Sequence, residues 1–170
     1  MADPNQVLVA NLIEALQHLQ RFIVIGLGAS VSALALTSKT TAQDRVTVPG
    51  TSVAVVPDVA RFILLAICIL VGAKASYAAG SANTIAERLQ SAPALLSAAC
   101  TFPSVATSPY IGVRVLAALL PFIFAMIAIV RTALPYGAVG RKSIPGWLIF
   151  MAAAYVPLSL ALISSRCLAK

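Results

Sequence analysis

The sequence predicts an all-α integral membrane protein, built as a bundle of four transmembrane helices. An N-terminal amphipathic helix precedes the bundle, and a short extended or hairpin-like loop joins the first two spans. The composition supports this fold class, because hydrophobic residues make up 60% of the 170 residues and charged residues only 10%. Soluble domains carry roughly 25% charged residues. With a mean hydropathy of +0.95, the chain is expected to form a single membrane domain over residues 1–170.

Residues 4–21 are predicted to form the amphipathic helix. Asp3 suits the N-cap and Pro4 suits the first helical position. Apolar and polar side chains then separate onto two faces, with Leu8, Leu12, Ala15 and Leu19 on one and Asn11, Glu14, His18 and Arg21 on the other. Such a helix lies in the membrane interface or against a partner. Alternatively, it continues into the first span as one long rod.

Four apolar windows follow, and each is long enough to cross a bilayer. A transmembrane helix needs about 20 apolar residues, with about 17 tolerated. The windows cover approximately residues 22–38, 59–80, 111–131 and 145–164. An even number of spans predicts that the N- and C-termini lie on the same side of a multi-pass protein.

The connection between the first two spans, VTVPGTSVAVVP at residues 46–57, has the pattern of paired strands. Pro49-Gly50 fits a type II turn. A flat, uncharged strand edge invites pairing with other chains, so the valines need cover. We expect the loop to pack on its own bundle or to dock onto another protein, through Val48, Pro49, Gly50, Val53 and Val55.

The connection between the second and third spans, residues 81–110, is the longest. Pro93, Pro103 and Pro109 interrupt any long helix there. We expect a surface-lying helix followed by an extended stretch, and a re-entrant dip is the alternative.

The net charge of +7 comes from basic residues scattered at the ends of apolar runs. Nucleic-acid binding needs clustered Lys and Arg, so anionic lipid head groups are the favoured partner and nucleic acid is not. The 12 basic residues divide equally between the two sides. Orientation is therefore left to a partner, to the N-terminal helix, or to dual topology. The predicted lipid, anion or partner contacts are Arg61, Lys74, Arg114, Arg131, Arg141 and Lys142.

Small residues recur every four positions in two spans, which is typical of close helix packing in lipid. One set is Gly28 and Ser32, and the other is Gly72, Ser76 and Gly80. These faces would pack either the protein's own helices or those of another subunit.

Catalytic chemistry has few candidate residues. None of the five acids lies well inside a span, which disfavours a proton-coupled carrier. A single histidine, His18, cannot form a metal site alone, and no nucleophile motif or phosphate loop occurs. We therefore expect no enzyme activity, no metal and no cofactor other than bound phospholipid. Cys100 and Cys167 share one side and would be able to bridge if that side is oxidising.

These observations predict a non-catalytic accessory or scaffold subunit of a larger membrane complex, which binds partner subunits and anionic lipid. The leading alternative is a homo-oligomeric pore or channel, whose basic rims would favour anions. A small-molecule carrier is a third and weaker candidate, because the acids are misplaced.

Overall fold

The computed structural model describes residues 4–37, 46–47, 54–134, 137–165 and 167, with only the backbone described at 46–47, 54–55 and 137–141. The described helices are α1 (Pro4–Leu36), α2 (Pro57–Arg88), α3 (Pro93–Ala99), α4 (Ile111–Ala133) and α5 (Gly137–Ile163). Two single-turn 3₁₀ helices, η1 (Leu89–Ser91) and η2 (Val105–Thr107), flank α3. Four of the described helices are long and apolar enough to cross a membrane. The predicted multi-pass helical bundle is confirmed at this level of length and composition.

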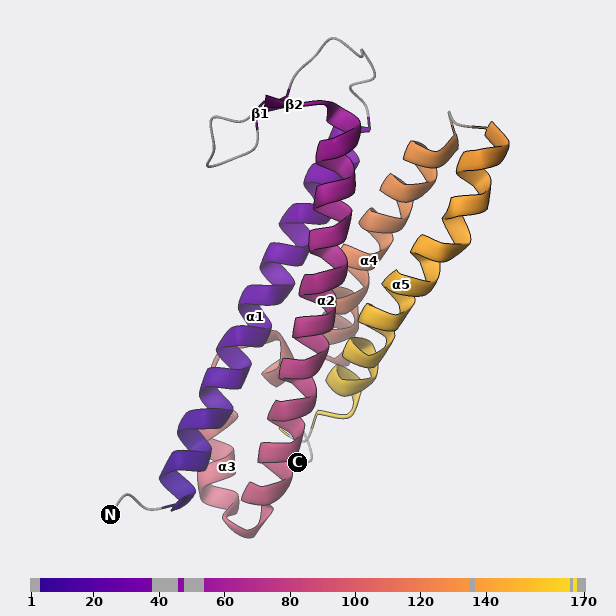
Figure 1. Ribbon diagram of the computed structural model, residues 1–170. Coiled ribbons are helices and arrows are strands. Elements are labelled where there is room, and N and C mark those ends of the chain that lie inside the picture. The colour runs from indigo at the N-terminus through magenta and orange to yellow at the C-terminus, as the bar shows by residue number, and fades with distance from the viewer. Residues whose placement is uncertain (1–3, 38–45, 48–53, 135–136, 166, 168–170) are drawn as a thin grey trace.

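α1 is one continuous helix of 33 residues, so it contains both the predicted amphipathic segment and the first span. No proline interrupts it after Pro4. At 1.5 Å per residue it is about 50 Å long, whereas the hydrocarbon core of a bilayer is about 30 Å thick. α2 has 32 residues and is almost as long. Both helices extend past α4 and α5 at the end where α1 begins (Figure 1).

The four long helices form a ring in the order α1, α2, α5, α4. α1 packs against α2 and α4, and α5 packs against the same two helices. α1 begins and α5 ends at one end of the bundle, and the β1–β2 connection lies at the other (Figure 1). This arrangement places residues of α2 and α5 side by side although they are far apart in sequence.

The size of the buried side chains differs along the bundle. Leu12, Leu16 and Leu19 of α1 are buried toward α2 and the last turn of α5, whereas small residues such as Ala118 and Ala125 fill the seams between the spans. Large apolar side chains point outward instead, with Leu70 66% and Ile149 68% exposed. Outward-facing apolar side chains around a tightly packed interior fit lipid as the surrounding solvent.

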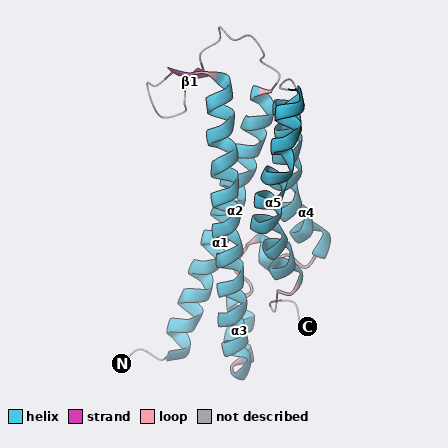
Figure 2. Cartoon of the chain, turned by 45° about the vertical axis from the view of Figure 1, so that its right-hand side comes forward, coloured by secondary structure: helices cyan, strands magenta, loops and turns pink. Residues whose placement is uncertain are grey.

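In the connection between α2 and α4, helix α3 lies beside the extended ends of α1 and α2 (Figure 2). Gln20 of α1 accepts a hydrogen bond from the Val105 backbone at 3.1 Å. A disulfide joins Cys100, just after α3, to Cys167, just after α5. The connection is thus a set of short helices fixed to α1 and to the end of α5.

Strands β1 (Val46–Thr47) and β2 (Ala54–Val55) pair antiparallel, with Val46 opposite Val55. The predicted docking residues Val48, Pro49, Gly50 and Val53 lie outside the described residues, as does the side chain of Val55. The docking prediction therefore stays a prediction.

Candidate functional site

At mid-bundle, the side chain of Tyr155 crosses from α5 to α2 and α1. Its hydroxyl donates a hydrogen bond to the Cys68 carbonyl at 3.1 Å. A Cβ atom at Gly72 would lie 2.6 Å from the tyrosine ring, and one at Gly26 would lie 3.2 Å from its hydroxyl. The Cys68 thiol in turn donates to the Gly26 carbonyl at 3.7 Å. Because Gly26 and Gly72 have no side chain, Tyr155 of α5 has the space to pack against both α1 and α2.

The same face of α2 continues to hold α5 further along. Ser76 Oγ donates to the Ala154 carbonyl at 2.5 Å, and Asn83 Nδ2 donates to the Ala161 carbonyl at 2.9 Å. Side-chain hydrogen bonds to a neighbouring backbone are a common way for helices to associate in lipid. Gly72 and Ser76 are thus used inside the chain's own bundle.

The other predicted small residues face outward. Ser32 is exposed, and outside the backbone of the same helix no atom of the described residues lies within 4 Å of the position that a Cβ would take at Gly28 or Gly80. The sequence pattern of the two stripes is alike, but the structure gives them different surroundings. The face of α1 that carries Gly28 and Ser32 is unoccupied by the described residues.

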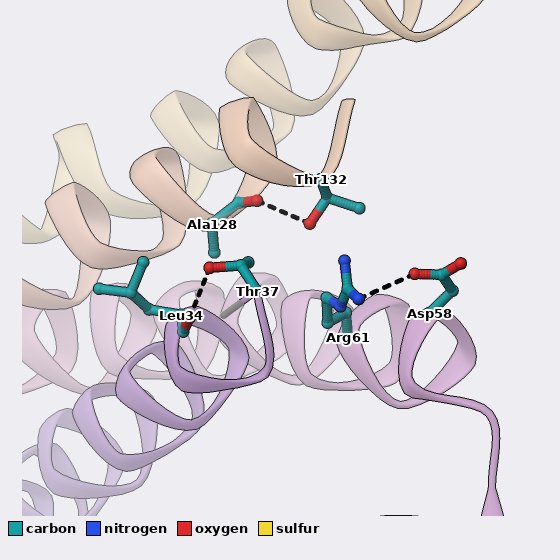
Figure 3. Close-up of polar contacts among 6 residues, drawn as sticks. All are labelled: Leu34, Thr37, Asp58, Arg61, Ala128 and Thr132. Carbon is teal, nitrogen blue, oxygen red and sulfur yellow. Dashed lines mark hydrogen bonds and ion pairs between the residues drawn. The ribbon is translucent and has the colours of Figure 1, made fainter. Parts of the chain in front are cut away.

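At the end of the bundle nearest β1 and β2, Arg61 is buried with 7% of its surface exposed. Its Nη2 lies 3.1 Å from Asp58 Oδ1, one turn earlier on α2. Thr37 and Thr132 donate to the carbonyls of their own helices nearby, and Figure 3 shows these contacts from α1, α2 and α4. Arg61 Nε is buried without a hydrogen-bond partner among the described residues. The cation is therefore held mainly by one carboxylate.

At the opposite end, Arg114 is also buried, with 4% exposure. Its Nη1 donates to the Leu162 carbonyl at 3.0 Å. That carbonyl belongs to the last turn of α5, where helix carbonyls lack intrahelical donors and where a positive charge is favourable. Arg114 thus caps α5 from α4. Of the other predicted basic contacts, Lys74, Arg131 and Lys142 are exposed, and the side chain of Arg141 lies outside the described residues.

An open groove of about 440 Å³ runs between α1 and α2 on the outer face of the bundle. We call it the α1–α2 groove. Ala15 and Ala78 form part of its floor, because small side chains at a helix seam leave a hollow. Six polar residues line it: Asn11, Glu14 and His18 from α1, and Lys74, Tyr77 and Ser81 from α2.

The charges in the α1–α2 groove have few internal partners. His18 Nε2 lies 3.5 Å from Glu14 Oε1, and both side chains are largely exposed. Lys74 makes no hydrogen bond or ion pair with any residue that the structure describes. Sequence reasoning identified Lys74 but missed its grouping with Glu14 and His18. The i, i+4 spacing of the latter two was visible in the sequence, whereas their place in one groove with Lys74 depends on how α1 packs on α2.

The sequence reasoning also missed Tyr155, although a tyrosine in the middle of an apolar span carries a hydroxyl that needs a partner. The chain matches no protein-family model, no curated protein and no solved structure.

Proposed function

We propose that the chain is a non-catalytic accessory subunit that binds a transmembrane helix of another protein along the outer face of α1. The observation that carries this proposal is the exposed pair Gly28 and Ser32. Outside the backbone of its own helix, no atom of the described residues lies within 4 Å of a Cβ at Gly28, and Gly28 is eight residues, or about 12 Å, from the end of α1. This position is well inside the apolar part of the helix.

The chain itself shows how such a pair is used. Gly72 and Ser76 have the same spacing on α2, and there the glycine admits Tyr155 while the serine donates to a carbonyl of α5. Ser32, by contrast, makes no hydrogen bond with a described residue. A hydroxyl facing lipid without an acceptor costs free energy. A neighbouring helix would supply both the acceptor and the close packing.

Anionic lipid is the second proposed partner. Arg131 and Lys142 are exposed close to where α4 ends and α5 begins, and exposed basic residues at the ends of spans attract anionic head groups. They would hold the subunit at a constant depth beside its partner.

The proposal includes an orientation. Disulfides persist in oxidising compartments, and Cys100 and Cys167 are bridged at the end where α1 begins and α5 ends. That end would face the oxidising side, and the β1–β2 connection would face the reducing side. The equal division of basic residues does not oppose either orientation.

The test is purification of the tagged chain from its own membrane in mild detergent, followed by identification of the co-purifying chains by mass spectrometry. We expect a defined membrane protein at a constant ratio, lost on Gly28→Leu or Ser32→Leu. Gly146→Leu is the matched control, because Gly146 also lies in a span with no atom within 4 Å of a Cβ. The control should retain the partner.

A different outcome would replace the proposal with a pore. In that case the chain would purify as a single stable homo-oligomer with no other protein, and it would conduct ions after reconstitution. Loss of the ion flux on Lys74→Ala or Arg114→Ala would then identify basic residues of the conduction path.

A further inference from the structure

The position of the α1–α2 groove along the bundle brings it to a membrane surface. Arg61 and Arg131 lie near the end of the bundle that carries β1 and β2. Lys74 is 13 residues along α2 from Arg61, or about 20 Å, and Ser81 is 20 residues along, or about 30 Å. The hydrocarbon core is about 30 Å thick. The groove therefore extends from about 10 Å inside the apolar region to the level of the opposite head groups.

The surroundings of the groove match the two parts of a phospholipid. One turn from Lys74 toward the middle of the bundle, Leu70 is exposed on the same face of α2, and Ile25 is exposed one turn beyond Phe22 on α1. These side chains offer an apolar surface on which acyl chains would lie. Tyr77, at the groove itself, is exposed, as is typical of aromatic residues at the membrane interface.

The charges in the groove select among head groups. Lys74 supplies a cation that has no partner among the described residues, and Glu14 supplies an exposed carboxylate on the neighbouring helix. A head group with a phosphate and a primary ammonium complements both charges. A head group with only a phosphate would leave Glu14 facing a like charge, and a trimethylated ammonium has no N–H to donate.

We propose that the α1–α2 groove binds the phosphoethanolamine head group of a membrane lipid, with Lys74 on the phosphate and Glu14 on the ammonium. His18, beside Glu14 at 3.5 Å, orients the carboxylate, and Asn11 and Ser81 add hydrogen-bonding groups on the water-facing side. A volume of about 440 Å³ is in the range of small-ligand sites. This site is separate from the Gly28–Ser32 face, which begins about 15 Å further along α1 than His18.

The test is native mass spectrometry of the purified full chain with added lipids that share the same acyl chains and differ only in the head group. The head groups are phosphoethanolamine, phosphoglycerol and phosphocholine. We expect the wild type to retain the phosphoethanolamine lipid up to about fivefold better than the other two, which is the largest effect typical of one exposed ionic contact. Equal retention of all three, or preference for phosphoglycerol, would overturn the proposal.

Two variants separate the two contacts. Lys74→Gln should reduce retention of all three lipids about fivefold, whereas Glu14→Gln should remove only the preference for phosphoethanolamine. Arg88→Gln and Glu87→Gln are the matched controls, because both residues are exposed on α2 and neither lines the groove. Control variants that lower retention as much as the groove variants would contradict the assignment. Circular dichroism of each variant verifies that the chain is folded.

A competition experiment distinguishes a lipid ligand from a soluble phosphate ester. Free O-phosphoethanolamine should not displace the lipid at equal concentration, because it lacks the acyl chains that would contact Leu70 and Ile25. Displacement at equal concentration would show that the ligand is the soluble compound and would refute the lipid assignment. The partner-binding proposal is tested in native membranes with Gly28 variants, so the two proposals fail independently.

Discussion

Replacing Gly72 by alanine tests the close approach of α2 and α5 at mid-bundle. An alanine Cβ would lie 2.6 Å from Tyr155 Cε2 and 2.8 Å from Cζ, whereas carbon atoms pack at about 3.5–4.0 Å. The ring would have to move by about 1 Å to relieve the overlap. It is held by the hydrogen bond to Cys68 at 3.1 Å and by Phe122, whose ring centroid is 6.2 Å away. The clash therefore cannot be relieved without loss of other contacts.

The expected destabilisation follows from three contributions. Overpacking of a well-packed core typically costs about 1–3 kcal/mol. Loss of one interhelical hydrogen bond in a membrane protein adds about 0.6 kcal/mol. Alanine has a better helix propensity than glycine, which offsets at most about 1 kcal/mol. The free energy of unfolding should therefore fall by about 0.6–3.6 kcal/mol.

The assay is unfolding of the purified chain by sodium dodecyl sulfate in mild detergent, followed by circular dichroism. Gly28→Ala and Gly80→Ala are the controls, since a Cβ at either position meets no atom within 4 Å. Both should be neutral or slightly stabilising. If Gly72→Ala is as stable as these two variants, Tyr155 does not occupy the space in front of Gly72 and the mid-bundle packing described above is wrong.

Two further predictions concern the ends of the bundle. Asp58→Asn should lower the free energy of unfolding in the same assay by about 1–3 kcal/mol, because it leaves the buried Arg61 charge without its carboxylate. Arg61→Met should lower the free energy of unfolding by less, because the Asp58 side chain left behind is 41% exposed and can be hydrated. A larger decrease for Arg61→Met than for Asp58→Asn would contradict the burial of Arg61. Cys100→Ser should lower the melting temperature through loss of a cross-link between residues 67 apart, worth up to about 4 kcal/mol in the chain-entropy account. A reductant should have the same effect on the wild type and none on the variant, and equal melting of oxidised and reduced wild type would show that the bridge does not stabilise the chain.

The span prediction could be made from the sequence because it depends only on local composition. Arg114 and Arg131, for example, enclose a charge-free stretch, and the structure places α4 over that stretch. The number of helices suited to span a membrane followed in the same way. The continuity of α1 was left open, because an amphipathic stretch and an apolar stretch in sequence do not reveal whether the backbone bends between them.

The role of the small-residue stripes could not be predicted. Gly72 with Ser76 and Gly28 with Ser32 have the same spacing, yet one pair holds α5 and the other faces outward. The difference arises from the angle at which each helix is rotated about its axis and from which helix lies next to it. Neither quantity is encoded by spacing along one helix.

The sequence by itself determined that four segments of this protein are long and apolar enough to cross a membrane, because this follows from the scarcity and spacing of charged residues. Tertiary structure alone decided that Cys100 meets Cys167, that Tyr155 bridges three helices, and that Lys74 shares a groove with Glu14. Each of these arrangements brings together residues that are far apart in the chain. Such contacts depend on the order of the helices around the bundle, and that order is set by the packing of all the helices together.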